Sequence, residues 1–224
     1  MDAIRKALDE NRTTLSEHES KELLRSYGIP VTREEEVSDE KSLLKVVREI
    51  GFPLVMKGCA PQLTHKTERG LVRVDIRTEQ EALMVFREMT REMKDENGTV
   101  LVQEMIKGSR ELVAGLTRDA QFGPCVMFGL GGIFTEVLGD VSFRMAPIDK
   151  EDAIDMMKEI KARKILGAMR GMPAADLDSV ADILMKVGRI GLKESRIKEI
   201  DINPMIVSGT KPIAVDALVV LNSK

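Results

Sequence analysis

In five stretches of the chain the apolar residues recur every three or four positions, which is the spacing of a helix. The first is the best marked, because Ser16 can cap its amino end, Glu19 completes a capping box, and Gly28 and Pro30 stop it. In the next two stretches the apolar residues follow one stripe, as in an amphipathic helix. The five predicted helices are residues 16–27, 38–50, 79–93, 149–167 and 175–188.

Shorter apolar runs predict strands. These runs are residues 53–57, 71–76, 100–105, 110–117, 124–128, 133–138 and 141–145, and a hairpin follows at residues 199–216. Two helices inserted among mostly antiparallel strands predict an α+β protein of two lobes. We place the lobes at residues 1–97 and 98–224, because the Asn97-Gly98 turn separates a helix from a strand.

Composition narrows the class of protein. With 224 residues, 43% of them hydrophobic and 32% charged, the chain has the composition of a soluble globular protein with a real core. A net charge of −3, one Tyr and no Trp provide neither the positive charge nor the aromatic stacking residues that are typical of nucleic-acid binding. The charged N-terminus does not read as a secretory signal, and no apolar run approaches a membrane span. Cys59 and Cys125 lie far apart and outside metal-binding spacing, so we expect reduced thiols in a cytoplasmic protein.

The hairpin at residues 199–216 carries the clearest chemistry. A turn with Gly209 and Thr210 at its tip places Asn203 across from Asp216, and Asp201 shares their face because strand side chains alternate. Such an oxygen-rich face suits Mg²⁺, which takes one or two protein oxygens and completes its shell with water and phosphate. A solvated hairpin face with an Asn-Pro turn explains the spacing equally well.

A second candidate segment covers residues 52–72. Lys57 ends an apolar strand, His65 lies in the loop that follows, and Gly70 comes after it. Together they can form a phosphate-handling site, in which the lysine supplies a charge, the glycine close approach and the imidazole a nucleophile. The alternative for His65 is an exposed histidine in a loop.

A third segment covers residues 101–115. Met105 and Ile106 can offer an apolar edge and backbone groups to a purine, while Gln103 and Glu111 can reach ribose or amine groups. The alternative is an ordinary strand, turn and strand with scattered charges.

The glycine-rich segment at residues 126–147 is not a dinucleotide-binding fingerprint. That motif must open a helix, whereas the sequence IFTEVLGDVSF that follows the glycines reads as strand. A glycine loop between strands, with Glu136 and Arg144 nearby, can instead pack against a nucleotide or a phosphorylated partner.

Four segments, taken together and in order, resemble a known family. They read MKGCAPQLTHK, QEMIKGSRELVAG, FGLGGIFTEVLGDVSFRMAP and EIDINP, and they are similar to the ATP-grasp β subunit of ADP-forming acetyl-CoA (acyl-CoA) synthetase. The resemblance runs from Leu15 to the C-terminus. It implies one ATP-grasp domain of two α/β lobes with the nucleotide bound between them. The related succinyl-CoA synthetase β subunit has a similar hairpin with a magnesium Asn and a following Asp.

The resemblance also implies roles for individual residues. Those assigned to the nucleotide are Lys57 and Gly70 at the phosphates, Gln103, Glu104, Met105 and Ile106 at the adenine hinge, and Glu111. Those assigned to chemistry are Asn203 and Asp216 as ligands of Mg²⁺ and His65 as a phosphorylated histidine. We add Asp201 or Glu136 as the group that orients His65, and Arg144 as a further catalytic candidate, from their places in the hairpin and the glycine-rich segment. One departure stands out, because members of the family usually have a second glycine where this chain has Leu71.

The implied reaction is acyl-CoA + phosphate + ADP ⇌ acid + CoA + ATP, a reversible acid–thiol ligase reaction. This chain would perform the nucleotide half, passing phosphate between a phosphohistidine and ADP or ATP. A CoA-binding α subunit that carries the first phosphohistidine would complete a hetero-oligomer. Two alternatives stay open: another ATP-grasp carboxylate ligase, which would not need His65, and a non-catalytic nucleotide-binding subunit that regulates a partner.

Overall fold

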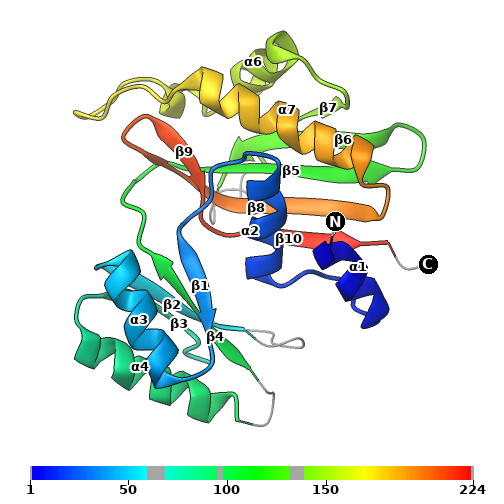
Figure 1. Cartoon of the computed structure of the whole chain (residues 1–224). Helices are drawn as coiled ribbons and strands as arrows, with labels where there is room; N and C mark the ends of the chain where they lie inside the picture. The colour runs from blue at the N-terminus through cyan, green and yellow to red at the C-terminus, as the bar shows by residue number, and fades with distance from the viewer. Residues whose placement is uncertain (1, 60–68, 95–97, 132–138, 223–224) are drawn as a thin grey trace. The chain divides into compact units, whose positions relative to one another are not determined.

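The computed structural model describes residues 2–59, 69–94, 98–131 and 139–222, and the chain divides into two compact units (Figure 1). The larger unit combines Met1–Val31 with Ile106–Lys224, and the smaller unit is Thr32–Met105. This division differs from the expected one at residues 97 and 98. The strand that follows Asn97-Gly98 pairs inside the smaller sheet, so the chain leaves that unit only after Met105.

The smaller unit is a four-stranded antiparallel sheet with two helices. Its strands lie in the order β1-β4-β2-β3, and α3 and α4 pack against them through one apolar cluster. Asp39 and Thr78 cap the two helices, each accepting a hydrogen bond from a backbone N–H three residues on. The elements are β1 (Glu34–Val37), α3 (Glu40–Ile50), β2 (Leu54–Cys59), β3 (Val72–Ile76), α4 (Glu79–Glu92) and β4 (Thr99–Glu104).

The larger unit is built on a six-stranded antiparallel sheet, in which β10-β8-β5-β6-β7 follow one another and β9 pairs with β8. Its strands are β5 (Glu111–Asp119), β6 (Gly123–Leu130), β7 (Val141–Met145), β8 (Ile197–Ser208), β9 (Lys211–Ala214) and β10 (Leu218–Leu221). Its helices are α1 (Asp2–Asp9), α2 (Glu17–Ser26), α6 (Lys150–Glu159), the 3-10 turn η1 (Arg163–Leu166) and α7 (Leu177–Lys193). None of the helices that the structure describes is long and apolar enough to span a bilayer.

The large sheet has one apolar face, which joins the helices in a single core. Ala114, Phe128, Ile200 and Val219 point into this core. The residues between them point the other way, because side chains alternate along a strand. We call this other side the second face of the large sheet, and it includes Glu111, Gly115, Met127, Phe143, Asp201 and Asn203.

Most predicted elements are found, and the differences are informative. The capping box of α2 is confirmed, with Glu19 N–H donating to Ser16 Oγ at 3.1 Å and Ser16 N–H donating to Glu19 Oε2 at 2.8 Å. Residues 149–167 form α6 and a separate 3-10 turn rather than one helix. The sequence patterns missed α1 and β1 and did not separate β10 from the hairpin. The predicted strand at residues 133–138 lies outside the described residues.

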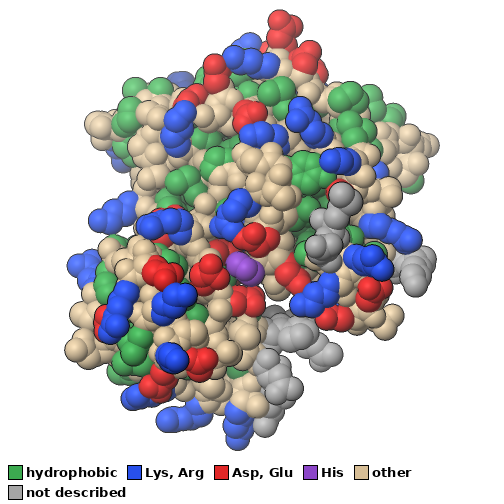
Figure 2. Space-filling model, in the orientation of Figure 1, with side chains coloured by type: hydrophobic (Ala, Val, Ile, Leu, Met, Phe, Trp, Pro, Cys, Tyr) green, Lys and Arg blue, Asp and Glu red, His purple; other side chains and the backbone are tan. Residues whose placement is uncertain are grey.

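Acidic and basic side chains are interspersed over the face of the molecule drawn in Figure 2. This mixture agrees with the small net charge of −3.

Candidate functional site

The hairpin of β8 and β9 has the predicted register. Met205 pairs with Ala214 and Ser208 with Lys211, around a turn in which Gly209 adopts a φ of +61°. Continuing the same pairing, the backbone N–H of Asn203 donates to the carbonyl of Asp216 at 3.2 Å. The turn chemistry therefore sets two oxygen-bearing residues opposite each other.

Asp201 lies on the second face of the large sheet, as predicted. Its partners across the ladder are Gly115 on β5 and Leu218 on β10, while Ile200 and Ile202 point into the core. Gly115 has no room for a side chain, since a Cβ there would lie 2.6 Å from the carbonyl oxygen of Ile200. Asp201 consequently borders a stretch of sheet with bare backbone. Glu111, which is exposed, belongs to the same face.

Negative charge accumulates around Asp201. Burial raises the pKa of its carboxyl above the ordinary value, and the neighbouring charges of Glu199 and Asp216 raise it further. Glu199 and Asp216 therefore add repulsion between carboxylates to the larger effect of burial. A cation placed among them would relieve this repulsion.

The donor set suits Mg²⁺ in particular. Asn203 supplies an amide oxygen and Asp216 a carboxylate, which are the hard oxygen ligands that this ion prefers. Within the described ranges, no group of three or more His, Cys, Asp or Glu side chains is gathered to hold a metal. An amide oxygen and a carboxylate suit an open site, in which the ion keeps positions for water and for substrate phosphates.

In the smaller unit, Lys57 and Gln103 project from one face of the sheet. Val55 pairs with Gln103 and Lys57 with Leu101, so the lysine lies two positions along β2 from the partner of Gln103. Side chains in this diagonal relation are within reach of one small ligand. Both are buried, with 6% and 0% of their surface exposed. The apolar cluster with α3 and α4 takes the alternate residues, such as Met56 and Val102.

The predicted adenine hinge joins the two units. Glu104 is held by Arg33, whose backbone N–H and Nε donate to its carboxylate at 2.8 and 2.9 Å. The N–H of Met105 donates to the carbonyl of Pro53 at 3.2 Å. Ile106 is the first residue of the larger unit after this point. The backbone is thus anchored on the side of the smaller unit up to Met105.

Gly70 and Leu71 account for the one departure from the expected motif. Gly70 has a φ of +67°, which favours glycine, and Arg73 Nη1 donates to its carbonyl at 2.6 Å. Leu71 is fully buried in the apolar cluster of the smaller unit. A leucine at this position therefore contributes to the core.

The structure does not bring Arg144 to the second face of the large sheet. Arg144 pairs with Val126 across the ladder, and its guanidinium forms an ion pair with Glu159 of α6. This contact on the helical side explains the residue structurally, so we leave it out of the site. Two further predicted residues, His65 and Glu136, lie outside the described residues.

Glu34 lies opposite Gln103 in the smaller sheet, and the sequence patterns did not include it among the candidate site residues. It pairs with Gln103 across the β1–β4 ladder and is 6% exposed. The hydroxyl of Thr32 donates to its carboxylate at 3.0 Å. The only signal was an acidic run, Glu-Glu-Glu-Val, which has too few apolar residues to predict a strand.

Comparison with known proteins gives the family. The sequence model of the ATP-grasp domain family matches residues 6–221. The β subunit of ADP-forming acetate–CoA ligase I from Pyrococcus furiosus is 45% identical over 223 residues, covering 97% of this chain and 96% of that one. A structure of the dinucleotide-forming acetyl-coenzyme A synthetase 1 of Candidatus Korarchaeum cryptofilum, in complex with coenzyme A and Mg-AMPPCP, is 43% identical with a TM-score of 0.90 over 99% of both chains.

Longer relatives contain the same domain as one part. The ADP-forming acetate–CoA ligase I of Archaeoglobus fulgidus is 37% identical over 207 residues. The match covers 90% of this chain and 30% of the relative's own length. Fold, motifs and sequence identity agree. This chain belongs to the ATP-grasp family of ADP-forming acetate–CoA ligase β subunits.

Proposed function

We propose that this chain is the nucleotide-handling β subunit of an ADP-forming acyl-CoA synthetase. In the overall reaction, acyl-CoA, phosphate and ADP are converted reversibly into acid, CoA and ATP. The observation that carries the proposal is the pairing of Asn203 with Asp216 beside Asp201, an oxygen-rich face on a chain of this family. The related Korarchaeum enzyme was solved with Mg-AMPPCP and a phosphohistidine segment that points towards its nucleotide-binding site.

In this proposal residues of the larger unit bind the metal. Asn203 and Asp216 would hold Mg²⁺ through an amide and a carboxylate oxygen. When bound, the ion neutralises phosphate charge during phosphoryl transfer. Asp201 would keep the surrounding face negative. Glu111, on the same face, would accept hydrogen bonds from the nucleotide.

The residues of the smaller unit would hold the nucleotide itself. Lys57 would supply a fixed positive charge to the phosphates, and Gly70 would allow the backbone to approach them. Gln103 and the hinge from Glu104 to Ile106 would contact the base and ribose. Since the N–H of Met105 is bonded to Pro53, we expect the base to be read through other groups of this segment.

The phosphoryl carrier in this proposal is His65. In the direction of ATP synthesis the P–N bond to the imidazole breaks, its electrons return to the ring nitrogen, and a P–O bond forms to the terminal oxygen of ADP. Neutral imidazole is a nucleophile near pH 7, so the same step runs in reverse with ATP. Asp201 or Glu136 would orient the ring.

We propose a partner for the CoA half of the reaction. It would be a CoA-binding α subunit that carries the first phosphohistidine, and the assembly would be a cytoplasmic hetero-oligomer. The length of the Archaeoglobus ligase supports a second, larger part in the complete enzyme, since this chain corresponds to 30% of it.

Labelling with phosphate tests the function directly. With Mg·γ-labelled ATP, the chain together with its α subunit should gain acid-labile, alkali-stable label, and it should form ATP from acetyl-CoA, phosphate and ADP. His65→Ala should lose both while still binding nucleotide. The matched control is His18→Ala, because His18 is the other of the two histidines. If His65→Ala keeps full ATP formation, phosphate passes directly from the partner's histidine to ADP, and the carrier assignment is wrong.

A further inference from the structure

Lys21 of α2 is a charged residue in the core of the larger unit. It is 0% exposed, and its ammonium donates to Glu17 Oε1, one turn earlier, at 2.9 Å. A buried ion pair costs about as much in lost hydration as it gains in attraction, so burial of this kind is weak evidence for a contribution to stability. A further acceptor of the ammonium points to another role.

That acceptor is the backbone next to a candidate metal ligand. Lys21 Nζ donates to the carbonyl oxygen of Val215 at 3.1 Å, and this carbonyl belongs to the peptide group that leads into Asp216. The N–H of Val215 donates to Pro204 at 3.0 Å, and the carbonyl of Asp216 accepts from Asn203 at 3.2 Å. Strand β8 therefore holds this short segment on one side, and Lys21 holds it on the other.

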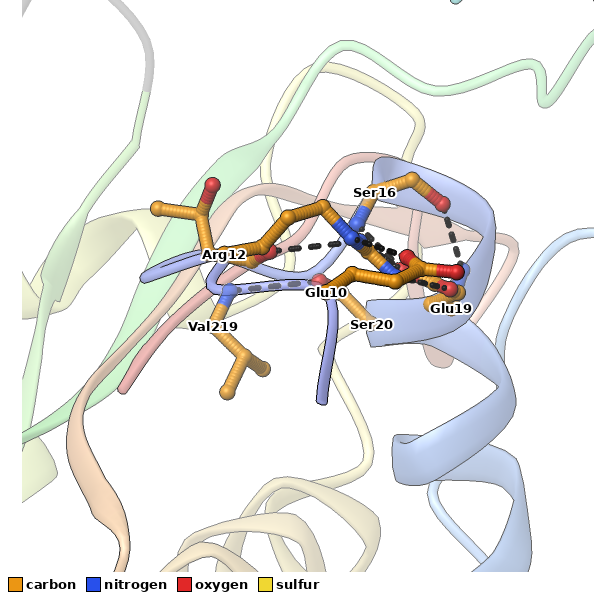
Figure 3. A network of polar contacts seen from close by, with 7 residues as sticks. Glu10, Arg12, Ser16, Glu19, Ser20 and Val219 are labelled. Atoms are coloured by element: carbon orange, nitrogen blue, oxygen red, sulfur yellow. Dashed lines mark hydrogen bonds and ion pairs between the residues drawn. The ribbon is translucent and has the colours of Figure 1, made fainter. Parts of the chain in front are cut away.

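A neighbouring residue of α2 contacts β10, the strand that follows the same connection. Ser20 Oγ accepts a hydrogen bond from the N–H of Val219 at 3.2 Å (Figure 3). Residues 215–217 lie between β9 and β10 and belong to neither strand. The helix therefore contacts Val215 at the start of this segment and the strand β10 that follows it.

We propose that Lys21 is a positioning residue of the metal site. It fixes the peptide group before Asp216, so that the carboxylate and the amide of Asn203 present their oxygens to one cation. Glu17 accepts a hydrogen bond from the ammonium and so fixes its direction. The inference rests on the proposed function, because it takes Asp216 as a ligand of Mg²⁺. An ion pair with a purely structural role would alter stability and leave metal affinity unchanged.

The test removes both buried charges together. In the double variant Glu17→Gln/Lys21→Met no charge is left buried and unpaired, which avoids the largest loss of stability. We expect the affinity of the ADP-bound protein for Mn²⁺, measured by electron paramagnetic resonance, to fall about 10- to 100-fold, as for other groups that orient metal ligands. Affinity for ADP without metal should stay at the wild-type value.

A second ion pair on the same helix provides the control. Arg12 and Glu19 are bonded at 2.7 and 2.9 Å and anchor the start of α2 (Figure 3). Among the described residues, the side chain of Arg12 donates hydrogen bonds to Glu10, Thr14 and Glu19, and none of these bonds involves Val215 or Asp216. Arg12→Gln/Glu19→Gln should lower the melting temperature and keep the wild-type affinity for Mn²⁺.

Two further variants separate the possible failures. Ser20→Ala keeps the buried pair and removes one tie, so it should weaken Mn²⁺ binding in the same direction but less; this variant also serves if the double variant does not fold. Asp216→Asn reports on the metal site itself. If Asp216→Asn leaves Mn²⁺ affinity unchanged, the proposed function loses its metal site. If Asp216→Asn weakens binding but neither the Lys21 double variant nor Ser20→Ala does, the positioning role is wrong.

Discussion

The two sheets of the molecule hold their candidate side chains in different ways. In the smaller unit all six residues of β2 are buried, so Lys57 projects from a strand without any exposed alternate position. In the larger unit β8 alternates, with Ile200 and Ile202 in the core and Asp201 and Asn203 half-buried on the second face. A charge in the first setting has lost most of its hydration, whereas a charge in the second has kept part of it.

This difference has a consequence for how function and stability are linked. A buried charge opposes folding unless other groups compensate it, so ligand binding and stability should change together at Lys57. Half-buried carboxylates tolerate replacement, so changes at the hairpin should affect function with little effect on stability. Four variants test the contrast, in order of decreasing effect.

Asp216→Asn should have the largest effect. It keeps the shape of the side chain but removes the charge that would bind Mg²⁺. Turnover should fall about 100- to 1,000-fold, the scale for losing one preorganised electrostatic contact to a transition state. The melting temperature without nucleotide should stay close to that of the wild type. Steady-state kinetics and thermal melts check both parts, and unchanged turnover in a folded variant would remove Asp216 from the metal site.

Lys57→Met should lower both ligand binding and stability. Wild-type protein at a ligand concentration about 100 times the dissociation constant should gain about 2.7 kcal/mol from Mg·ADP. The variant should lose most of this gain, and its melting temperature without ligand should also fall, because the groups that contact the buried ammonium lose their partner. Lys45→Met is the control, since the side chain of Lys45 is 75% exposed on α3 of the same unit. A full nucleotide-induced shift in the Lys57 variant would contradict its role.

Gly70→Ala sharpens the comparison within the smaller unit. Glycines 70 and 51 have φ values of +67° and +83°, and an alanine in left-handed backbone costs about 1–2 kcal/mol. We expect both alanine variants to melt at lower temperature. Only Gly70→Ala should also weaken binding of ADP in calorimetry, because only Gly70 belongs to the proposed phosphate site. Equal affinity in the two variants would argue against that site.

The smallest effect concerns the support of the hairpin. The pKa of Asp176, which caps α7, is lowered to about 2, first by the hydrogen bond from Lys211 of β9 and then by those from Ser179. The folded-state pKa lies below the ordinary 3.8, so this stabilisation is present above pH 3.8 and is lost as pH falls toward 2. The difference in melting temperature between wild type and Asp176→Asn should therefore shrink below about pH 4. A difference independent of pH would show that the charge of Asp176 does not matter.

Local signals made much of the fold predictable. Ser16 and Glu19 fix the start of α2 within four residues, and the turn at Gly209 sets the register that brings Asn203 opposite Asp216. The helix and strand periods gave most of the remaining elements. These features depend on neighbours in sequence, which is why patterns could reveal them.

Features that depend on distant contacts escaped prediction. Lys21 meets Val215 across 194 positions of sequence, and nothing near Lys21 announces this partner. β1 has three consecutive glutamates and becomes a strand because β4 pairs with it. The boundary between the units was misplaced for the same reason, since the pairing of β4 decides to which unit it belongs. Arg144 was included from its place in a motif, but the ladder register turns it toward α6.

The larger unit consists of two separate segments of the chain, and this affects how the protein folds during translation. Residues 32–105 are continuous, so the smaller unit can complete its sheet while the rest of the chain is still being translated. The α2 helix, by contrast, packs against β10, which leaves the ribosome roughly 10 to 40 seconds later at 5–20 residues per second. Until then the apolar stripe of α2 has no docking surface and is open to chaperones. We therefore expect premature termination before β10 to release α2 as well, so that the first and last segments of the chain are lost together.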